Sequence, residues 1–564
     1  MAYNHKPWLN AYDPGVRDDI EIPDISLVDC FDDVLIRFAE RPALHFFGRT
    51  LNYSRLMQYA DRFARALTDN GCRPGDVVGI QLPNVPQYLV AQVGALKAGC
   101  ATSGISPLLT AGEMAYQLND SRTKALVTLD ALFEHRFLKI NEELPHLNVV
   151  IVTGILDFLS GLKRCLAKIV RKVPTGKISP LADKKVLWFM DILRRYPDQG
   201  PEVKIAPQDF CLIQYTGGTT GVPKGTILTH RNIVANMIQV KEWSKPEEGN
   251  EVTLSAFPLF HLAGLMLGLL GISLGGAQVL IPDPRDTKHI VKEFARYHPT
   301  ILVNVPSLYM MLLEEPRFHK LDFSGLKFCI SGAAPFPVEG IRALERVIGE
   351  GKVVEVYGMT ETSPIITMNP RKGKKKIGTV GLPVQRTRVK LVDLETGARE
   401  VSVGEAGEII VQGPQVMQGY LNRPDETEIA LRVFQGERWL YTGDVAKMDD
   451  EGYFTIVDRS KDMVNVGGFK VFSREVEEKL NDHAAVELCA IIGVPNPKRP
   501  GSELVKMVAQ LAPPFRDWEE DTVKKEIIAF AKENLSPYKV PKIIQFIDKL
   551  PLTPVGKVDK KALR

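Results

Sequence analysis

Short apolar runs alternate with amphipathic stretches along much of the chain. Val77–Leu82 has the composition of a buried strand, and Pro86–Lys97, which follows it, has the spacing of a helix. Asp286 precedes a further helical stretch that ends at Tyr297, and aspartate is a favoured N-cap residue. Other strands are predicted at Ala125–Leu129, Phe210–Tyr215, Gln278–Ile281, Thr300–Val305, Leu326–Ser331 and Lys352–Tyr357, and other helices at Phe31–Phe38 and Pro337–Val347. This alternation predicts an α/β fold of largely parallel sheets with helices on both faces.

The pattern changes after about Thr387. Short alternating strands are predicted there, such as Arg388–Val392 and Glu408–Val411. A last block, from about Val464, is small, charged and of mixed helix and strand pattern. We therefore expect a large N-terminal domain over residues 1–457, a hinge at 458–462 and a small C-terminal domain over 463–564.

The segment Ile155–Tyr196 interleaves basic residues with Leu, Ile, Val, Trp188 and Phe189. This pattern is typical of an amphipathic helix on an anionic membrane surface. A solvated helix packed on the main domain is an equally good interpretation. Peripheral membrane contact through residues 155–196 is thus left open.

Composition excludes several classes of protein. A net charge of +3 over 564 residues argues against a nucleic-acid binder, which needs a strongly basic face. The seven cysteines are scattered, without paired spacing, so a reducing compartment is expected. The N-terminus has no apolar stretch of signal-peptide type, and no apolar run has the length of a membrane span. A cytoplasmic location is predicted, with contact to the inner face of the membrane as the open alternative.

The most specific motif is the loop that runs from Tyr215 to Gly225, YTGGTTGVPKG, between a predicted strand and a helix that begins near Thr229. Glycine backbone can approach an anion closely, and its N–H groups bind phosphate oxygens. Hydroxyl donors come from threonines, and Lys224 adds a positive charge. The residues assigned to phosphate binding are Thr216, Gly217, Gly218, Thr219, Thr220, Gly221 and Lys224. Because Lys224 is followed by Gly225, the loop is not a Walker P-loop.

With this loop, the sequence resembles the adenylate-forming superfamily of acyl-CoA synthetases, amino-acid adenylation domains and luciferases. Within it, the chain is most similar to the bacterial medium- and long-chain fatty acyl-CoA synthetases. The resemblance extends from about Phe31 to the C-terminus. It implies a large domain with a small β-barrel-like subdomain, a small mobile α+β C-terminal domain, and the use of ATP, Mg²⁺ and coenzyme A.

Further motifs follow in the order of this family. In Tyr357-Gly358-Met359-Thr360-Glu361, the resemblance implies that Thr360 contacts the α-phosphate and that Glu361 binds Mg²⁺, for which a carboxylate is a suitable ligand. The segment with Gly332, Ala333 and Ala334 would lie along the adenine and the acyl carboxylate. A surface glutamate and an ordinary turn are the alternatives for these two segments.

The C-terminal motifs complete the resemblance. Asp444 would hold the ribose hydroxyls, and Arg459 would contact the ribose or the phosphates. The loop with Gly467, Gly468 and Lys470 would serve the thioester step, and Lys557 would be the adenylation lysine. At the hinge, Lys461 stands where the family often has aspartate. Glu475 and Glu477 are expected to be solvated structural residues.

The acid is suggested by the apolar segment Phe257–Gly268, which lacks the aspartate that amino-acid adenylation domains use to hold an ammonium group. An uncharged acyl tail is favoured, and the resemblance implies a fatty acid of medium or long chain. His261 is expected either to line the pocket or to be satisfied by a backbone carbonyl. Asn304, Pro306 and Ser307 are weaker candidates for the lining.

The predicted reaction forms acyl-AMP with release of pyrophosphate and then transfers the acyl group to coenzyme A. Two alternatives stay open: a ligase that loads a carrier protein, and an inactive membrane-associated fatty-acid binding protein. The oligomeric state is not predicted.

Overall fold

The computed structural model describes residues 2–159, 174–216, 222–467, 469–499, 502–552 and 558–564. The chain forms two compact units. The larger unit contains Trp8–Arg388 and Gln412–Val433, and the smaller contains Met1–Pro7, Val389–Val411 and Phe434–Arg564. The predicted hinge at residues 458–462 lies inside the smaller unit, and the predicted domain limits stay a prediction.

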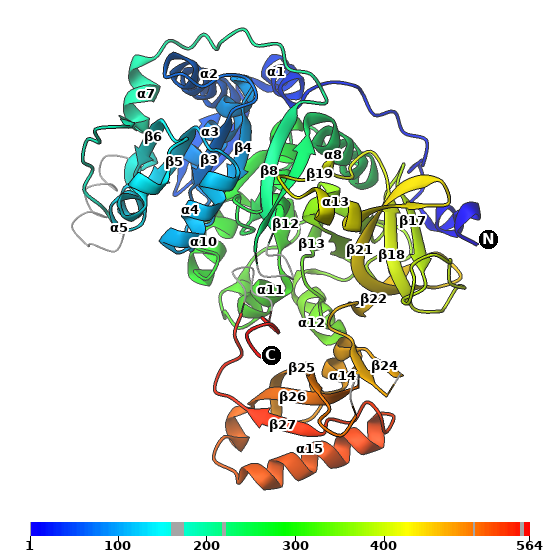
Figure 1. Ribbon diagram of the computed structural model, residues 1–564. Helices are drawn as coiled ribbons and strands as arrows, with labels where there is room; N and C mark the ends of the chain where they lie inside the picture. The colour runs from blue at the N-terminus through cyan, green and yellow to red at the C-terminus, as the bar shows by residue number, and fades with distance from the viewer. Residues whose placement is uncertain (1, 160–173, 217–221, 468, 500–501, 553–557) are drawn as a thin grey trace. The chain divides into compact units, whose positions relative to one another are not determined.

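The larger unit contains a nine-stranded sheet in the order β16-β15-β14-β13-β12-β10-β11-β1-β2. Figure 1 labels β12 and β13 of this sheet. Its strands are β1 (Pro42–Phe46), β2 (Arg49–Asn52), β10 (Val252–Ser255), β11 (Ala277–Leu280), β12 (Ile301–Asn304), β13 (Phe328–Ser331), β14 (Val353–Gly358), β15 (Ile365–Met368) and β16 (Leu382–Pro383). The six strands from β14 to β1 in this order are parallel, whereas β15, β16 and β2 are antiparallel to their neighbours. The parallel strands therefore end at one common edge.

A second sheet of the same unit has eight strands in the order β19-β9-β8-β4-β3-β5-β6-β7. They are β3 (Val77–Gln81), β4 (Ala101–Gly104), β5 (Ala125–Leu129), β6 (Val149–Thr153), β7 (Lys185–Trp188), β8 (Phe210–Thr216), β9 (Lys224–Thr229) and β19 (Gly419–Tyr420). Strands β8 and β9 form an antiparallel hairpin, and the short β19 adds to the outer side of β9.

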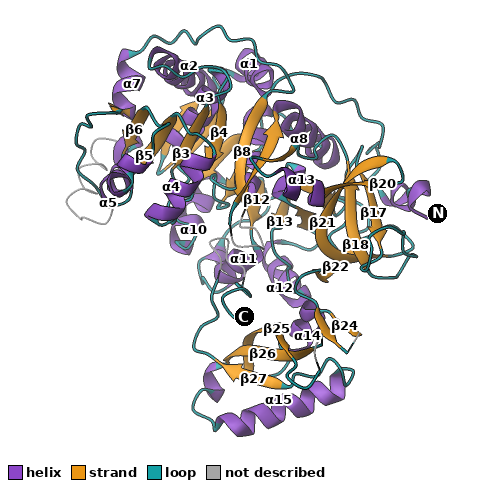
Figure 2. Cartoon of the chain, in the orientation of Figure 1, coloured by secondary structure: helices purple, strands orange, loops and turns teal. Residues whose placement is uncertain are grey.

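Helices cover and separate these sheets (Figure 2). They are α1 (Leu27–Phe38), α2 (Tyr53–Asp69), α3 (Pro86–Lys97), α4 (Ala111–Asp120), α5 (Asp130–His135), α7 (Phe189–Arg195), α8 (His230–Ser244), α9 (Leu262–Ser273), α10 (Thr287–Tyr297), α11 (Pro306–Leu313), α12 (Val338–Ile348) and α13 (Pro424–Ala430). Helix α3 begins with Pro86 at its first turn, where a missing N–H costs nothing, and is buried from Pro86 to Leu96. At Gly94 the helices pack closely, because an added Cβ would lie 2.6 Å from the Ala60 carbonyl oxygen of α2.

The smaller unit contains most of a five-stranded sheet. Arg388, Gln412 and residues 431–433 of its strands are assigned to the larger unit. The strands are β17 (Arg388–Val392), β18 (Gly407–Gln412), β20 (Leu431–Phe434), β21 (Glu437–Met448) and β22 (Phe454–Arg459). The hairpin β23 (Val464–Val466) and β24 (Phe469–Val471) follows. Then α14 (Ser473–Leu480) and α15 (Glu520–Asn534) accompany a three-stranded sheet of β25 (Val486–Pro495), β26 (Glu503–Leu511) and β27 (Ile543–Phe546). The predicted α/β class, with a smaller mixed C-terminal part, is confirmed.

The predicted amphipathic helix within Ile155–Tyr196 is wrong where the structure describes this segment. Lys185–Trp188 forms β7, parallel to β6, and only Phe189–Arg195 is an α-helix. Pairing with β6 satisfies the backbone hydrogen-bonding groups of Lys185–Trp188. The pattern of basic and apolar residues along the sequence does not reveal this pairing. Residues 160–173 lie outside the described residues. Among the described helices, none combines the length and apolar character needed to cross a membrane.

Candidate active site

Three neighbouring parallel strands of the nine-stranded sheet, β12, β13 and β14, end next to predicted site residues. β12 ends at Asn304 and β13 at Ser331, and these two residues are register partners. Ser331 is in turn opposite Glu355 in β14, which ends at Gly358. Ligands of open α/β sheets bind beyond the carboxyl ends of the strands. The segments with Ala333 and Ala334, with Tyr357 and Gly358, and with Thr360 and Glu361 all lie at this edge.

Glu361 lies in a short 3₁₀ turn, Thr360–Thr362, between β14 and β15. Its side chain is buried, and its Oε1 accepts a hydrogen bond of 2.7 Å from the Tyr420 hydroxyl. The turn requires a glycine before it, because a Cβ on Gly358 would lie 1.8 Å from the Pro364 carbonyl oxygen. The backbone thus holds the glutamate close to the strand end.

Lys224 begins β9 and is the register partner of Thr216 at the end of β8. Its ammonium group lies 5.0 Å from the centroid of the Tyr420 ring and forms an ion pair with Glu426. Lys224 and the predicted metal ligand Glu361 therefore both contact Tyr420, the lysine at the ring and the glutamate at the hydroxyl. Gly217, Gly218, Thr219, Thr220 and Gly221 lie outside the described residues.

Tyr420 was not predicted from the sequence. Its phenol has a pKa well above its usual value, because burial and the charge of Glu361 both disfavour the phenolate. The hydroxyl is therefore a hydrogen-bond donor at neutral pH. Its position directly after Gly419 is a local signal for a turn, and this signal does not point to Glu361.

His261 is the N-cap residue of α9, which carries the apolar segment predicted to line the acid pocket. Burial lowers its pKa to about 4, so the ring is neutral at neutral pH. Its buried Nε2 atom has no hydrogen-bond partner among the residues that the structure describes. The alternative of a backbone carbonyl partner is thus not found at this nitrogen.

Two further buried polar atoms lie at the same sheet edge. Within the described part of the chain, Nδ2 of Asn304 and Oγ of Ser331 have no hydrogen-bond partner. Unpartnered buried donors are costly, typically about 1–3 kcal/mol each, so a ligand or water at this edge is expected. Ala333 has a φ of 66°, a left-handed backbone conformation that is uncommon for alanine and is often found at functional sites.

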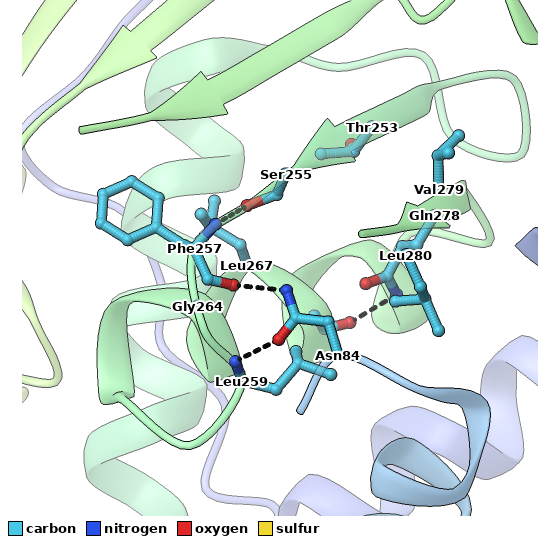
Figure 3. A pocket seen from close by; sticks show the side chains of 11 residues that line it. Asn84, Thr253, Ser255, Phe257, Leu259, Gly264, Leu267, Gln278, Val279 and Leu280 are labelled. Atoms are coloured by element: carbon cyan, nitrogen blue, oxygen red, sulfur yellow. Dashed lines mark hydrogen bonds between the residues drawn. The ribbon is translucent and has the colours of Figure 1, made fainter. Parts of the chain in front are cut away.

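A small cavity lies between α9 and the strands β10 and β11 (Figure 3). Its volume is about 10 Å³, enough for about one water molecule. The Asn84 side chain spans the loop before α9, donating to the Phe257 carbonyl at 2.9 Å and accepting from the Leu259 amide at 2.8 Å. Gln278 closes the other side, with Nε2 donating to the Gly268 carbonyl at 2.8 Å. With these two side chains in place, the cavity is closed to anything much larger than a water molecule.

In the smaller unit, Asp444 and Arg459 are register partners on β21 and β22. Nε of Arg459 lies 3.1 Å from Oδ1 of Asp444. The aspartate is buried and the arginine is half exposed, so the pair presents its guanidinium to solvent. Gly443, with a φ of 71°, makes the turn before the aspartate possible. The two predicted nucleotide-binding residues are thus adjacent.

The predicted thioester loop is the turn of the β23–β24 hairpin. Gly467 has a φ of 60°, and its amide donates to Oγ of Ser502 at 2.8 Å. Lys470 is opposite Asn465 in the hairpin. Gly468 and Lys557 lie outside the described residues.

The expectation that Glu477 is solvated is wrong. It lies 2.7 Å from the Lys560 ammonium and accepts a hydrogen bond of 2.6 Å from the Ile491 amide. Burial raises its pKa, an effect that the charge of Lys560 opposes. Glu475 is by contrast half exposed and pairs with Lys539.

Comparison with known families identifies the family to which this chain belongs. A family model described as AMP-binding enzyme matches residues 31–421, and a model described as AMP-binding enzyme C-terminal domain matches residues 475–557. The chain is an AMP-binding enzyme. The resemblance to adenylate-forming enzymes inferred from the sequence is confirmed.

This AMP-binding enzyme has relatives of similar length. It is 37% identical to a long-chain-fatty-acid–CoA ligase of Bacillus subtilis, over 99% of this chain and 98% of the relative. It is 38% identical to the ligase of that name from Escherichia coli O157:H7, with the same coverage. A feruloyl-CoA synthase of Amycolatopsis is 32% identical over 92% of this chain and 94% of the relative.

Solved structures resemble the AMP-binding enzyme over nearly its whole length. The anthranilate CoA ligase AuaEII in complex with anthranoyl-AMP has a TM-score of 0.81 and 27% identity, covering 97% of this chain and 98% of that one. ATP-bound MatB from Rhodopseudomonas palustris has a TM-score of 0.79 and 27% identity, with coverage of 96% and 98%.

Proposed function

We propose that this protein is a fatty acid–CoA ligase that forms an acyl-adenylate from ATP. The observation that carries the proposal is that Tyr420 contacts both Glu361, at the carboxyl edge of the nine-stranded sheet, and Lys224, at the start of β9. The names of the full-length relatives support fatty acid and coenzyme A as the other substrates.

In the first half-reaction, a carboxylate oxygen of the acid attacks the α-phosphorus of ATP. A bond from this oxygen to phosphorus forms, and the bond to the pyrophosphate leaving group breaks. Lys224 and the loop from Thr216 would bind the β- and γ-phosphates. Lys557 would bind the oxygens on which negative charge grows. The nucleophile is already ionised, so this step needs no general base.

The residues at the sheet edge fit a magnesium ion held through substrate phosphates. Glu361 supplies a carboxylate oxygen there, and Mg²⁺ commonly uses only one or two carboxylates when phosphates complete its shell. Within the described residues no group of three or more His, Cys, Asp or Glu side chains could hold a metal by itself. When bound, Mg²⁺ would neutralise phosphate charge and make pyrophosphate a better leaving group.

In the second half-reaction, the sulfur of coenzyme A forms a bond to the acyl carbon and the thiol proton is released to solvent. The bond from the acyl carbon to the phosphate oxygen breaks, and AMP leaves with this oxygen. We assign Asp444 and Arg459 to the ribose and phosphates of the nucleotide, and Gly467, Gly468 and Lys470 to the approach of the thiol. Neutral His261, with an unpartnered Nε2 among the described residues, is suited to donate a hydrogen bond to the acid's carboxylate.

The acid is proposed to have an uncharged apolar tail that lies along α9. Its buried residues are apolar. A fatty acid must displace the contacts of Asn84 and Gln278 that now close this region. Each CH₂ that becomes buried contributes about 0.8 kcal/mol, so affinity should rise with chain length until the space ends.

The test is release of AMP and pyrophosphate by the purified protein with ATP, Mg²⁺ and fatty acids from short to long, with and without coenzyme A. Ferulate and anthranilate serve as aromatic comparisons. Turnover that requires coenzyme A and peaks at one fatty-acid length supports the proposal. Turnover with release of AMP that coenzyme A does not increase, or acyl transfer to a carrier protein only, contradicts coenzyme A as the acceptor. Turnover with aromatic acids alone contradicts a fatty acid as the substrate.

A further inference from the structure

Tyr420 contacts two functional groups with two different parts of its side chain. Its hydroxyl donates to Oε1 of Glu361 at 2.7 Å, and the face of its ring lies 5.0 Å from the Lys224 ammonium. Glu361 follows a strand of the nine-stranded sheet, whereas Lys224 begins a strand of the eight-stranded sheet. One side chain therefore joins the predicted metal ligand to the phosphate loop.

Backbone contacts with β9 and with α13 hold Tyr420 in place. It is the register partner of Thr226 in β9, and the next residue, Leu421, donates its amide to the Gly225 carbonyl at 2.8 Å. The Tyr420 amide donates to Oγ1 of Thr427 at 2.9 Å, at the second turn of α13. The backbone of Tyr420 is thus paired with the strand that begins with Lys224, so the positions of the two residues are linked.

Glu361 is tied to the same segment by its own backbone. Its carbonyl accepts a hydrogen bond of 2.9 Å from the Met417 amide. With the bond from Tyr420 to Oε1, the main chain and the carboxylate are both held from residues 417–420. A hydrogen bond to a charged group is stronger than one between neutral groups, and it fixes the plane of the carboxylate.

We propose that Tyr420 is a positioning residue for the nucleotide step. Its hydroxyl orients the Glu361 carboxylate toward Mg²⁺, and its ring holds the Lys224 ammonium by a cation–π contact. The two effects are separable, because the hydroxyl acts on the metal ligand Glu361 and the ring acts on Lys224, which binds the phosphates. This inference rests on the proposed adenylation reaction.

The test uses two substitutions of the full chain. Tyr420→Phe removes the hydroxyl and keeps the ring, and Tyr420→Leu removes both. Binding of ATP is measured by calorimetry, once with excess Mg²⁺ and once with EDTA. For Tyr420→Phe we expect about tenfold weaker binding of MgATP and unchanged binding of metal-free ATP. For Tyr420→Leu we expect both affinities to fall.

Tyr12→Phe is the matched control, because its hydroxyl donates to the Pro383 carbonyl and contacts neither group. It should leave both affinities unchanged. In pyrophosphate–ATP exchange, Tyr420→Phe should require about tenfold more Mg²⁺ for half-maximal rate, and saturating Mg²⁺ should restore much of the rate. Equal losses of MgATP and metal-free ATP binding in Tyr420→Phe, or no loss in either, would overturn the inference.

A double-mutant cycle keeps the test decisive if the leucine variant does not fold. In a Glu361→Gln background, Tyr420→Phe should no longer change the difference between MgATP and ATP binding. A further tenfold change there would show that the hydroxyl acts through another group. If wild-type protein binds MgATP but makes no adenylate, the proposed function fails while this binding test still stands.

Discussion

Three histidine side chains are kept neutral by burial. The pKa values of His45, His230 and His261 are lowered to about 4, with desolvation as the main cause in each. At His230 the reason for neutrality is visible, because its Nδ1 accepts a hydrogen bond of 3.2 Å from the Leu27 amide. A protonated ring would lose this acceptor.

These histidines predict a fall in stability at mildly acidic pH. In the unfolded chain they have ordinary pKa values near 6.5, so between about pH 6.5 and 4 the unfolded state binds protons that the folded state does not. The free energy of unfolding should therefore decrease as pH falls through this window, by up to about 1.4 kcal/mol per pH unit for each histidine. Urea unfolding at a series of pH values measures the slope.

His230→Gln is the informative variant for this slope, because glutamine keeps a neutral acceptor at every pH. It should have a smaller pH dependence than the wild type. An unchanged slope would mean that His230 is not one of the groups responsible.

At the level of single elements, Lys560, near the end of the chain, is held against α14. Lys560 contacts both Glu477 at 2.7 Å and Oγ of Ser473 at 2.6 Å. The Ser473 hydroxyl donates to Oδ1 of Asp458 at 3.0 Å, and Asp458 is the penultimate residue of β22. This polar network joins the end of the five-stranded sheet to the first turn of α14 and to the last residues of the chain.

Removing Lys560 should loosen α14. Lys560→Ala leaves the largely buried Glu477 without its cation, and we expect a local loss of about 2 kcal/mol. Amide hydrogen exchange in α14 should then accelerate roughly thirtyfold. The control is Lys539→Ala, whose partner Glu475 is half exposed and should cost less than about 1 kcal/mol. Equal acceleration in both variants would contradict a special role for the buried pair.

Elements with strong local signals could be predicted from the sequence. Pro86–Lys97 coincides with α3, since a proline at the first turn and an unbroken apolar run mark it. Asp286 caps α10 as predicted, accepting from the His289 amide at 2.9 Å. β7 could not be predicted, because its identity as a strand depends on pairing with β6 and not on its own pattern.

The candidate site shows the same division. The phosphate loop and the segment ending at Glu361 have recognisable motifs. Tyr420 is remote in sequence from Glu361 and approaches it only through the pairing of β19 with β9. The burial of Glu477 likewise depends on Lys560, which is remote in sequence. Contacts of this kind require the three-dimensional arrangement.

At the level of the whole molecule, the two half-reactions are expected to depend on different residues of the C-terminal part. Lys557→Ala should slow adenylation by at least about a hundredfold, because it removes a charge from the transition state. The same variant should still form acyl-CoA from synthetic acyl-AMP and coenzyme A. Separate assays of pyrophosphate release and of thioester formation measure the two steps.

Lys549→Ala serves as the comparison, since Lys549 is an exposed lysine of the same region. It should change neither step. A Lys557→Ala enzyme that has lost both steps would contradict the division of roles between Lys557 and the Gly467–Lys470 loop.

The larger unit is interrupted in sequence by residues 389–411, which belong to the smaller unit. β14 and the turn with Glu361 are complete before this interruption, whereas Tyr420 comes after it. During translation, the ribosome therefore makes Glu361 and Lys224 long before the tyrosine that connects them. All strands of the nine-stranded sheet, and all strands of the eight-stranded sheet except β19, precede this interruption, so the nascent chain can pair them while the contact of Tyr420 with Glu361 and Lys224 is still missing. This contact requires residues 412–433, so in a newly made chain the predicted metal ligand Glu361 gains its hydrogen bond from Tyr420 only after the first strands of the other unit have emerged.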